Sequence, residues 1–178
     1  MSLLGELPYV VMPLADVPAA TAPEETAETY EGNALLKARA VVGLGADVIL
    51  ADDSGLEVDA LGGGPGVHSA RFGGPTLDDA GRVALLLERL RGVPPDRRTA
   101  RFRCVIALVD RAGAARTVEG VVEGLIAGTP RGHGGFGYDP VFFHPGFART
   151  FGELSDAEKA RVSHRALAAR AARALLLE

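Results

Sequence analysis

The sequence predicts an α/β domain built around a mixed β-sheet. Segments with the apolar period of a helix alternate along the chain with segments that have the period of a strand, and no linker, repeat or low-complexity tract separates them. The chain has 178 residues, of which 47% are apolar and 24% charged, which is enough to bury a core in one domain. This composition excludes a disordered tail, a coiled coil and a collagen-like repeat.

The first part of the chain predicts strands around one helix. We expect a short strand from Pro8 to Leu14, followed by a helix that Thr29 caps and that ends near Val42. An apolar run from Asp47 to Ala51 is typical of a buried strand, and we expect it to end at a turn formed by Asp52 to Gly55. A second, half-exposed strand with alternating apolar residues follows that turn.

The second part of the chain predicts a long hairpin between helices. Thr76 with Asp79 forms a capping box that opens a helix to Leu90. The remaining predicted elements are a hairpin of Thr99 to Val109 and Ala115 to Ile126, a loop from Gly128 to Pro140, a strand from Val141 to Phe143, a short helix capped by Ser155 and Glu158, and a last helix from about Ser163. Gly120 and Gly124 inside the hairpin indicate bends or close packing.

Charge and composition favour a small ligand in the cytoplasm. The chain has 19 basic and 23 acidic residues, so no global positive field is present to hold a nucleic acid. Cys104 is the single cysteine and cannot form an internal disulfide, and the N-terminus lacks the pattern of an export signal. Arg165, Arg170 and Arg173 interrupt the C-terminal apolar segment before it reaches the length of about 18 residues that a membrane span needs.

Lysine is almost absent from the chain. Of the 19 basic residues, 17 are arginines, and the two lysines are Lys37 and Lys159. Asn33, the single asparagine, lies four residues before Lys37, which places both on one face of the expected helix. Either lysine could occur by chance, or each could mark a position that needs a compact point charge.

The adjacent carboxylates of Asp52 and Asp53 are a candidate metal site. Two like charges at the end of an apolar strand repel each other unless a cation or hydrogen-bond donors compensate them. A hard divalent ion such as Mg²⁺ takes oxygen ligands and would serve. An ordinary Asx/Ser turn, in which one carboxylate is solvated and the other accepts backbone hydrogen bonds, explains the residues equally well.

Two further segments carry groups suited to a nucleotide. The loop from Gly132 to Gly137 matches G-x-G-x-x-G, but a strand follows it where the dinucleotide fingerprint requires a helix. Its aromatic residues could stack on a flat ligand or could fold into the core of a glycine-rich hairpin loop. The donors of Ser163, His164 and Arg165 suit a phosphate or a purine carbonyl, although a surface cap with solvated charges is the simpler interpretation.

Three separated motifs resemble the inosine triphosphate pyrophosphatase family. They are ADDSGLEVDALGGGPGVHSARF from Ala51, GGFGYDPVF from Gly134 and EKARVSHRALA from Glu158. The resemblance implies hydrolysis of ITP, dITP and XTP to the monophosphate and pyrophosphate, through attack of Mg²⁺-activated water on the α-phosphate. It also implies a homodimer, and a long mixed sheet flanked by helices whose two lobes border a central cleft.

The resemblance assigns roles to residues in all three motifs and in the helix before them. Asp53 is expected to be the general base and a metal ligand, and the substrate-binding residues are expected to be Lys37, Ser54, Phe136, Gly137, Tyr138, Asp139, Lys159, His164 and Arg165. Phe136 would stack on the purine, and Lys37 would face the phosphates. Both lysines of the chain therefore fall on the family's site.

This chain departs from the family pattern in two places. Family members begin with a strand and a Thr-Gly-Asn loop that holds the triphosphate, whereas Met1 to Leu7 here resemble the end of the helix that follows that loop. We therefore expect residues 1–178 to form a single domain that lacks the first strand and phosphate loop. Where many members have Glu directly before the helix Asn, this chain has Gly32, so a metal role does not carry over to Glu31. An alternative hypothesis is a truncated, catalytically weak module for nucleotide binding or dimerisation.

Overall fold

Helices flank a five-stranded sheet in the computed structural model, which describes residues 3–18 and 20–178. The main elements are α1 (Tyr30–Arg39), β1 (Val48–Val58), α2 (Asp79–Arg89), β2 (Thr99–Asp110), β3 (Ala115–Ile126), β4 (Phe142–His144), β5 (Arg149–Thr150), α3 (Asp156–Val162) and α4 (His164–Leu176). The predicted α/β class is therefore confirmed.

The strands are neighbours in the sheet in the order in which they occur in the chain, β1-β2-β3-β4-β5. The β3–β4 and β4–β5 pairs are antiparallel, and Ile126 lies opposite Phe142. Contacts at the two ends of β1, from Arg111 N–H to the Asp47 carbonyl and from Thr99 Oγ1 to Asp59, show that β2 runs antiparallel to β1 as well. The described pairings are thus antiparallel, where the sequence predicts a mixed sheet.

The chain divides into two compact units. Unit 1 consists of Met1–Ser54, Cys104–Gly120 and His164–Glu178, and unit 2 consists of Gly55–Arg103 and Val121–Ser163. Strands β1, β2 and β3 each contribute one part to either unit, because the boundaries fall inside them.

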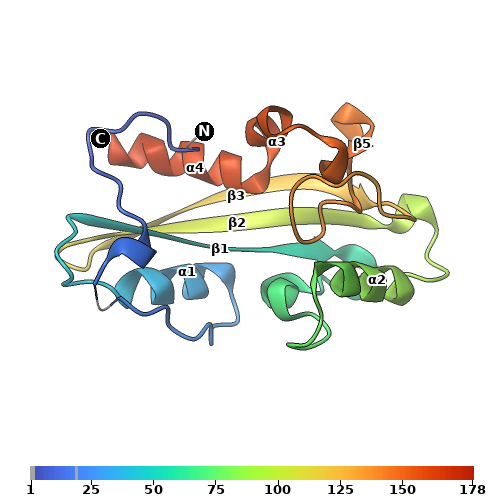
Figure 1. Cartoon of the computed structure of the whole chain (residues 1–178), viewed down its shortest axis with the longest axis horizontal. Helices are drawn as coiled ribbons and strands as arrows, with labels where there is room; N and C mark the ends of the chain where they lie inside the picture. Colours follow the sequence, from blue (N-terminus) through green and yellow to red (C-terminus); the bar gives the residue numbers. More distant parts are fainter. Residues whose placement is uncertain (1–2, 19) are drawn as a thin grey trace. The chain divides into compact units, whose positions relative to one another are not determined.

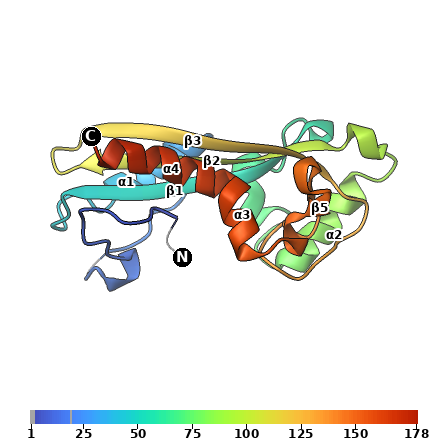
Figure 2. The same ribbon diagram turned by 90° about the horizontal axis from the view of Figure 1, so that it is seen from above.

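Two helices cover the sheet in unit 1. Helices α1 and α4 lie on opposite faces of the strands (Figures 1 and 2). On the α4 face, the small side chains of the helix pack against β2; the cluster contains Cys104, Ile106, Leu108, Ala168, Ala169 and Ala172. The alanines let α4 approach the strands closely, and Gly120 of β3 lacks the side chain that would block this approach.

The core of unit 2 is built around three aromatic rings. The Phe142 ring centroid lies 4.5 Å from that of Phe102 and 4.9 Å from that of Phe151. Leu86 and Leu90 of the α2 segment are fully buried in the same cluster. Aromatic pairs in tilted contact add to the stabilisation from buried apolar area, so this cluster fixes the strands and loops around it.

Several predicted helix starts are confirmed and one is wrong. The Thr29 side chain accepts a hydrogen bond from Gly32 N–H at the start of α1, and Ser155 with Glu158 forms the predicted capping box of α3. Helix α2, however, begins at Asp79 with Asp78 as its N-cap, whose carboxylate accepts from Gly81 N–H. The capping box predicted for Thr76 does not form, because the helix begins later and Asp78 supplies the capping acceptor, to Gly81 N–H.

The segment from Pro8 to Leu14 is not a strand. Val10, Val11 and Met12 are exposed, and a short 3-10 turn occupies Leu14–Asp16. An apolar run forms a stable strand only where a neighbouring strand supplies hydrogen bonds, and the sheet does not include this segment. Residues 3–7 of the proposed helix end are also not helical, and Met1 and Ser2 lie outside the described residues.

Within residues 3–18 and 20–178, no helix combines the length and the apolar character that crossing a membrane requires.

Gly120 allows the close approach of α4 to β3. A Cβ atom at this position would overlap the carbonyl oxygen of His164 and the backbone nitrogen of Ala168. We expect Gly120→Ala to lower the free energy of unfolding by about 3 kcal/mol, because rigid backbone atoms would have to move. Urea unfolding of both variants measures this. Gly128→Ala is the matched control, since a Cβ there meets nothing within 4 Å and neither glycine has positive φ; equal losses would show that close packing is not the reason.

Candidate active site

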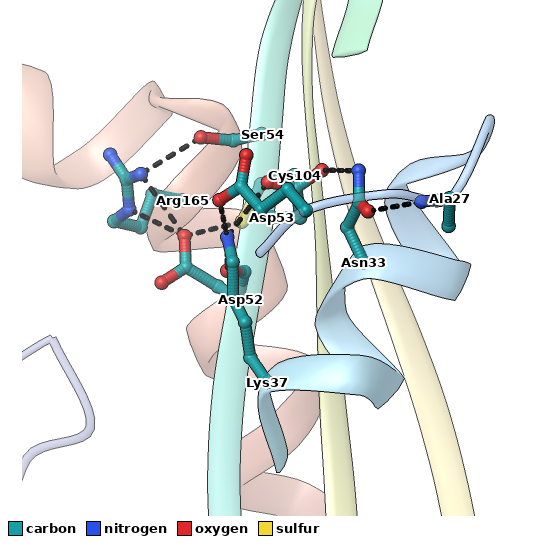
Figure 3. Close-up of polar contacts among 9 residues, drawn as sticks. Ala27, Asn33, Lys37, Asp52, Asp53, Ser54, Cys104 and Arg165 are labelled. Carbon is teal, nitrogen blue, oxygen red and sulfur yellow. Dashed lines mark hydrogen bonds and ion pairs between the residues drawn. The ribbon is translucent and has the colours of Figure 1, made fainter. Parts of the chain in front are cut away.

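The Asp52–Gly55 segment is the centre of a strand and not a turn. Strand β1 is continuous from Val48 to Val58, so the predicted end of the strand at Asp52 is wrong. Successive side chains of a strand point to opposite faces, which places Asp53 on one face and both Asp52 and Ser54 on the other. The strand can continue because each carboxylate meets a cationic side chain on its own face (Figure 3).

Asp53 is held from both of its oxygens by helix α1. Lys37 Nζ lies 2.9 Å from Oδ1, and Asn33 Nδ2 lies 3.2 Å from Oδ2 (Figure 3). The Asn33 amide is oriented in turn by Ala27 N–H, which donates to its Oδ1 at 2.9 Å. Asp53 is 6% exposed, so these two donors replace the water that the ionised carboxylate would lose on burial.

Glu25 is a member of this group that sequence reasoning missed. Its Oε1 lies 2.6 Å from Lys37 Nζ, which also donates to the Asp52 carbonyl at 3.0 Å. Burial disfavours the charged lysine, but the hydrogen bonds to Glu25 and Asp53 outweigh it, so the pKa of Lys37 is raised above its ordinary value. Glu25 lies in an irregular segment before α1, where no periodic pattern marks a residue that points at a site.

Arg165 of α4 neutralises the other face of β1. Its Nε and Nη2 lie 3.1 and 3.0 Å from Asp52 Oδ2, and Nη2 also donates to Ser54 Oγ at 2.8 Å (Figure 3). Cys104 lies beside the same carboxylate, and burial together with Asp52 raises its pKa to about 12. The thiol is therefore protonated and is not a nucleophile at neutral pH.

The remaining candidate residues of unit 1 are His164 and Glu31. His164 is the first residue of α4 and is buried next to Arg165. Glu31 accepts a hydrogen bond from Thr117 Oγ1 at 3.0 Å and lines a shallow hollow with Val105, Val118 and Glu119. Its carboxylate is thus engaged with β3.

The residues from Phe136 to Asp139 form a tight turn in unit 2. Phe136 N–H donates to Asp139 Oδ2 at 2.7 Å, and Lys159 Nζ of α3 forms an ion pair with the same oxygen. The lysine also lies 4.6 Å from the centroid of the Phe136 ring, which is 63% exposed. Tyr138 is buried instead and donates from its hydroxyl to the Ser69 carbonyl, and burial raises its pKa to about 12. Phe136 is therefore exposed, as expected of a ring that stacks on a ligand, whereas Tyr138 folds into the core, as the second alternative predicts.

The glycines before this turn are required by close contacts. A Cβ at Gly132 would overlap the Gly152 carbonyl, and one at Gly135 would overlap the Asp139 carboxylate. Both have positive φ, of 76° and 74°. The loop is therefore pinned against the 150–154 segment, with Gly134 N–H donating to the Gly152 carbonyl at 3.0 Å.

The side chains predicted for the site form two groups, each within one unit. Unit 1 holds Lys37, Asp53, Ser54, His164 and Arg165, and unit 2 holds Phe136, Gly137, Tyr138, Asp139 and Lys159. In unit 1, Lys37 of α1 contacts Asp53 on one face of β1, and Arg165 of α4 contacts Ser54 on the other.

The oxygen atoms around Lys37 are suited to a hard cation. Glu25, Asp53 and the Asp52 carbonyl all direct oxygens at one ammonium group. Among the described residues, no set of three or more His, Cys, Asp or Glu side chains has the spacing of a metal site. Mg²⁺ commonly binds through one or two carboxylates together with substrate phosphates, so Asp53 and Glu25 fit that ion when a phosphate chain accompanies it.

Fold and side chains together define an α/β protein with a buried carboxylate–lysine centre and an exposed aromatic turn. The chain belongs to the Ham1 family, whose model matches residues 1–175.

Relatives named as pyrophosphatases of non-standard nucleotides resemble it closely. A dITP/XTP pyrophosphatase of Desulforamulus reducens is 48% identical over 174 residues, covering 98% of this chain and 87% of that protein. A HAM1 protein structure from Coxiella burnetii matches with a TM-score of 0.90 and 40% identity, over 98% of this chain and 89% of that one. A nucleoside-triphosphatase, or dITP/XTP pyrophosphatase, from Mycobacterium abscessus matches with a TM-score of 0.75 and 48% identity, over 91% and 81% of the two chains.

Glu158 makes the start of α3 sensitive to acid. Hydrogen bonds from Ser155 N–H and from Arg149 lower the pKa of Glu158 from 4.5 to about 2. Because the folded pKa lies below the ordinary value, the ionised carboxylate stabilises the fold above pH 4.5, and this contribution is lost as the pH falls towards 2. We expect Glu158→Gln to lower Tm at pH 6 and to make Tm depend less on pH between 5 and 3. Thermal unfolding followed by circular dichroism measures both.

The control for this acid dependence is Glu88→Gln, on the exposed side of α2 and outside the Arg149 network. The dependence of its Tm on pH should be the same as that of the unmodified protein. The same dependence in Glu158→Gln would contradict the stabilising role of the ionised Glu158 carboxylate.

Proposed function

We propose that this chain hydrolyses deaminated purine nucleoside triphosphates, ITP, dITP and XTP, to the monophosphate and pyrophosphate. The proposal is supported by relatives named dITP/XTP pyrophosphatases that are 46–49% identical to it. The structural observation that carries it is Asp53, a buried carboxylate held by Lys37 and Asn33 beside a second carboxylate, Glu25. Such a centre can bind a metal-associated polyanion and accept a proton.

Asp53 is the general base in this proposal. It accepts a proton from a water molecule whose oxygen attacks the α-phosphorus, while the bond from that phosphorus to the bridging oxygen breaks and pyrophosphate leaves. Asn33 holds the carboxylate in place through Oδ2, the oxygen that Lys37 does not contact. Lys37 supplies a positive charge against the phosphates and is oriented by the oxygens of Glu25 and Asp52.

Mg²⁺ is the proposed metal, held by Asp53 and Glu25. When bound, it would offset the charge of the triphosphate and polarise the phosphoryl oxygens. Lys37 contacts the same two carboxylates in this structure, so the protein keeps them neutralised by its own cation.

The turn in unit 2 provides the proposed contacts to the base and sugar. Phe136 offers an exposed ring for stacking on the purine, and Gly137, Tyr138 and Asp139 form the surrounding backbone and acceptor groups. Lys159 holds Asp139 and contacts the Phe136 ring, which keeps both in one arrangement.

Discrimination against adenine follows from hydrogen-bond polarity. Hypoxanthine presents a carbonyl oxygen where adenine presents an amino group, and we assign His164 and Arg165 as the donors that meet it. With adenine those donors would face another donor, which costs about 1–3 kcal/mol per buried group. Ser54 Oγ accepts a hydrogen bond from the Arg165 guanidinium and fixes its orientation.

We further propose a cytoplasmic homodimer that binds neither nucleic acid nor membranes. The net charge of −4 gives no field for a polyanionic polymer, and the single cysteine is buried and free.

Activity on dITP is the first test. The protein should release pyrophosphate from dITP and XTP much faster than from dATP, and Asp53→Asn should lower kcat at least about 100-fold, because the proton acceptor is lost. A coupled pyrophosphate assay measures both. Asp96→Asn, at an exposed position in unit 2, is the control and should leave kcat unchanged. No release from dITP or XTP by the unmodified protein in Mg²⁺ would refute the proposal.

Metal dependence is tested separately. Removal of divalent ions with EDTA should abolish activity and added Mg²⁺ should restore it. Glu25→Gln should raise the Mg²⁺ concentration at half-maximal rate about tenfold, since one of two carboxylate ligands is lost. Glu28→Gln, in the same irregular segment, is the matched control. An unchanged Mg²⁺ requirement in Glu25→Gln would remove Glu25 from the metal site.

A further inference from the structure

The Phe136 ring is 63% exposed and lies outside the core cluster of unit 2. Lys159 contacts the ring, and hydrogen bonds hold the backbone on either side of the residue. Within the turn, Phe136 N–H donates to the Asp139 carboxylate and Asp139 N–H donates to the Phe136 carbonyl at 3.2 Å. These bonds close the turn on one side. The Gly137 amide is bonded outside the turn.

The acceptor of that amide is Asp79, at the first position of α2. Asp79 Oδ2 accepts from Gly137 N–H at 2.7 Å, and Oδ1 accepts from Arg82 Nη2 at 2.9 Å. Hydrogen bonds from Arg82 and from the Gly137 amide hold the pKa of Asp79 below its ordinary value. The carboxylate is therefore ionised at neutral pH, and both of its oxygens have assigned donors.

Helix capping does not explain this carboxylate. Asp78 is the N-cap of α2 and accepts from Gly81 N–H at 2.8 Å, so the cap is complete without Asp79. The ion pair with Arg82 is an exposed contact between residues three apart, of the kind that contributes little to helix stability. The hydrogen bond to Gly137 joins segments 58 residues apart in the chain. Neither helix capping nor the ion pair with Arg82 requires it.

We propose that Asp79 is a positioning residue for nucleotide binding: by holding the Gly137 amide it sets the direction of the Phe136 ring and keeps the Phe136–Asp139 turn in its binding form. This inference rests on the proposed function, because it assigns the turn to the base. Asp79 itself contacts no substrate. Gly137 has a φ of 59°, a conformation that glycine adopts without strain, so the amide needs an external acceptor to hold one orientation.

The test separates the Gly137 bond from the helix. Asp79→Ala should raise KM for dITP about tenfold and change kcat less than twofold, because the ring that binds the base is no longer oriented. Asp79→Asn keeps an acceptor oxygen and should restore KM to within about threefold of the unmodified value. Arg82→Ala removes the ion pair and keeps the Gly137 bond, so its KM should not change. Asp78→Ala should lower Tm and leave KM unchanged, since it removes the cap alone.

Amide hydrogen exchange supplies a readout that needs no activity. The peptide covering residues 134–140 should exchange faster in Asp79→Ala than in the unmodified protein, and Asp79→Asn should reverse most of this change. Faster exchange together with an unchanged KM would overturn the positioning role, and unchanged exchange would overturn the anchor itself. Absence of dITP hydrolysis by the unmodified protein refutes the proposed function instead, and the exchange result still decides whether Asp79 holds the turn.

Discussion

Two adjacent carboxylates in the middle of a strand are the constraint on which unit 1 depends. Asp52 and Asp53 would repel each other on one surface, but the strand directs them to opposite faces. Each face then needs its own cation, and the two helices of unit 1 provide them: α1 brings Lys37 to Asp53, and α4 brings Arg165 to Asp52. The placement of α1 is therefore set by charge as well as by apolar packing, because the buried Asp53 carboxylate would cost several kcal/mol if it were unpaired, whereas Asp52 is only half-buried.

The cations also explain why β1 does not end where its sequence suggests. Acidic pairs next to serine and glycine favour a turn, since such residues bond to their own backbone. Here Ser54 instead shares the Arg165 guanidinium with Asp52, and Asp53 accepts from Asn33 and Lys37. Partners more than a dozen residues away thus replace the local bonds of a turn, and the backbone remains free to pair in the sheet.

The fold class, the hairpin of β2 and β3, and the caps of α1 and α3 could be predicted, because they depend on local periodicity and on a cap within one turn of helix. The failures have non-local causes. The Pro8–Leu14 segment has a strand pattern but no neighbour in the sheet, and β1 continues through an acidic pair because of distant cations. In the candidate site, motif residues such as Asp53 were identifiable by resemblance, whereas Glu25 and Asp79 act from an irregular segment and a helix start, where only the folded geometry shows their direction.

The two lysines illustrate why a compact charge matters in a chain that otherwise uses arginine. Arginines make the exposed ion pairs, as Arg101 does with Asp59 and Glu123. Lys37 instead places one ammonium among the oxygens of Glu25, Asp53 and the Asp52 carbonyl, and Lys159 is bonded to Asp139 while it contacts the Phe136 ring. A planar guanidinium cannot direct its donors at three convergent oxygens, whereas an ammonium can. Each lysine thereby stabilises a carboxylate of its own unit, through contacts that a planar guanidinium could not make in the same place.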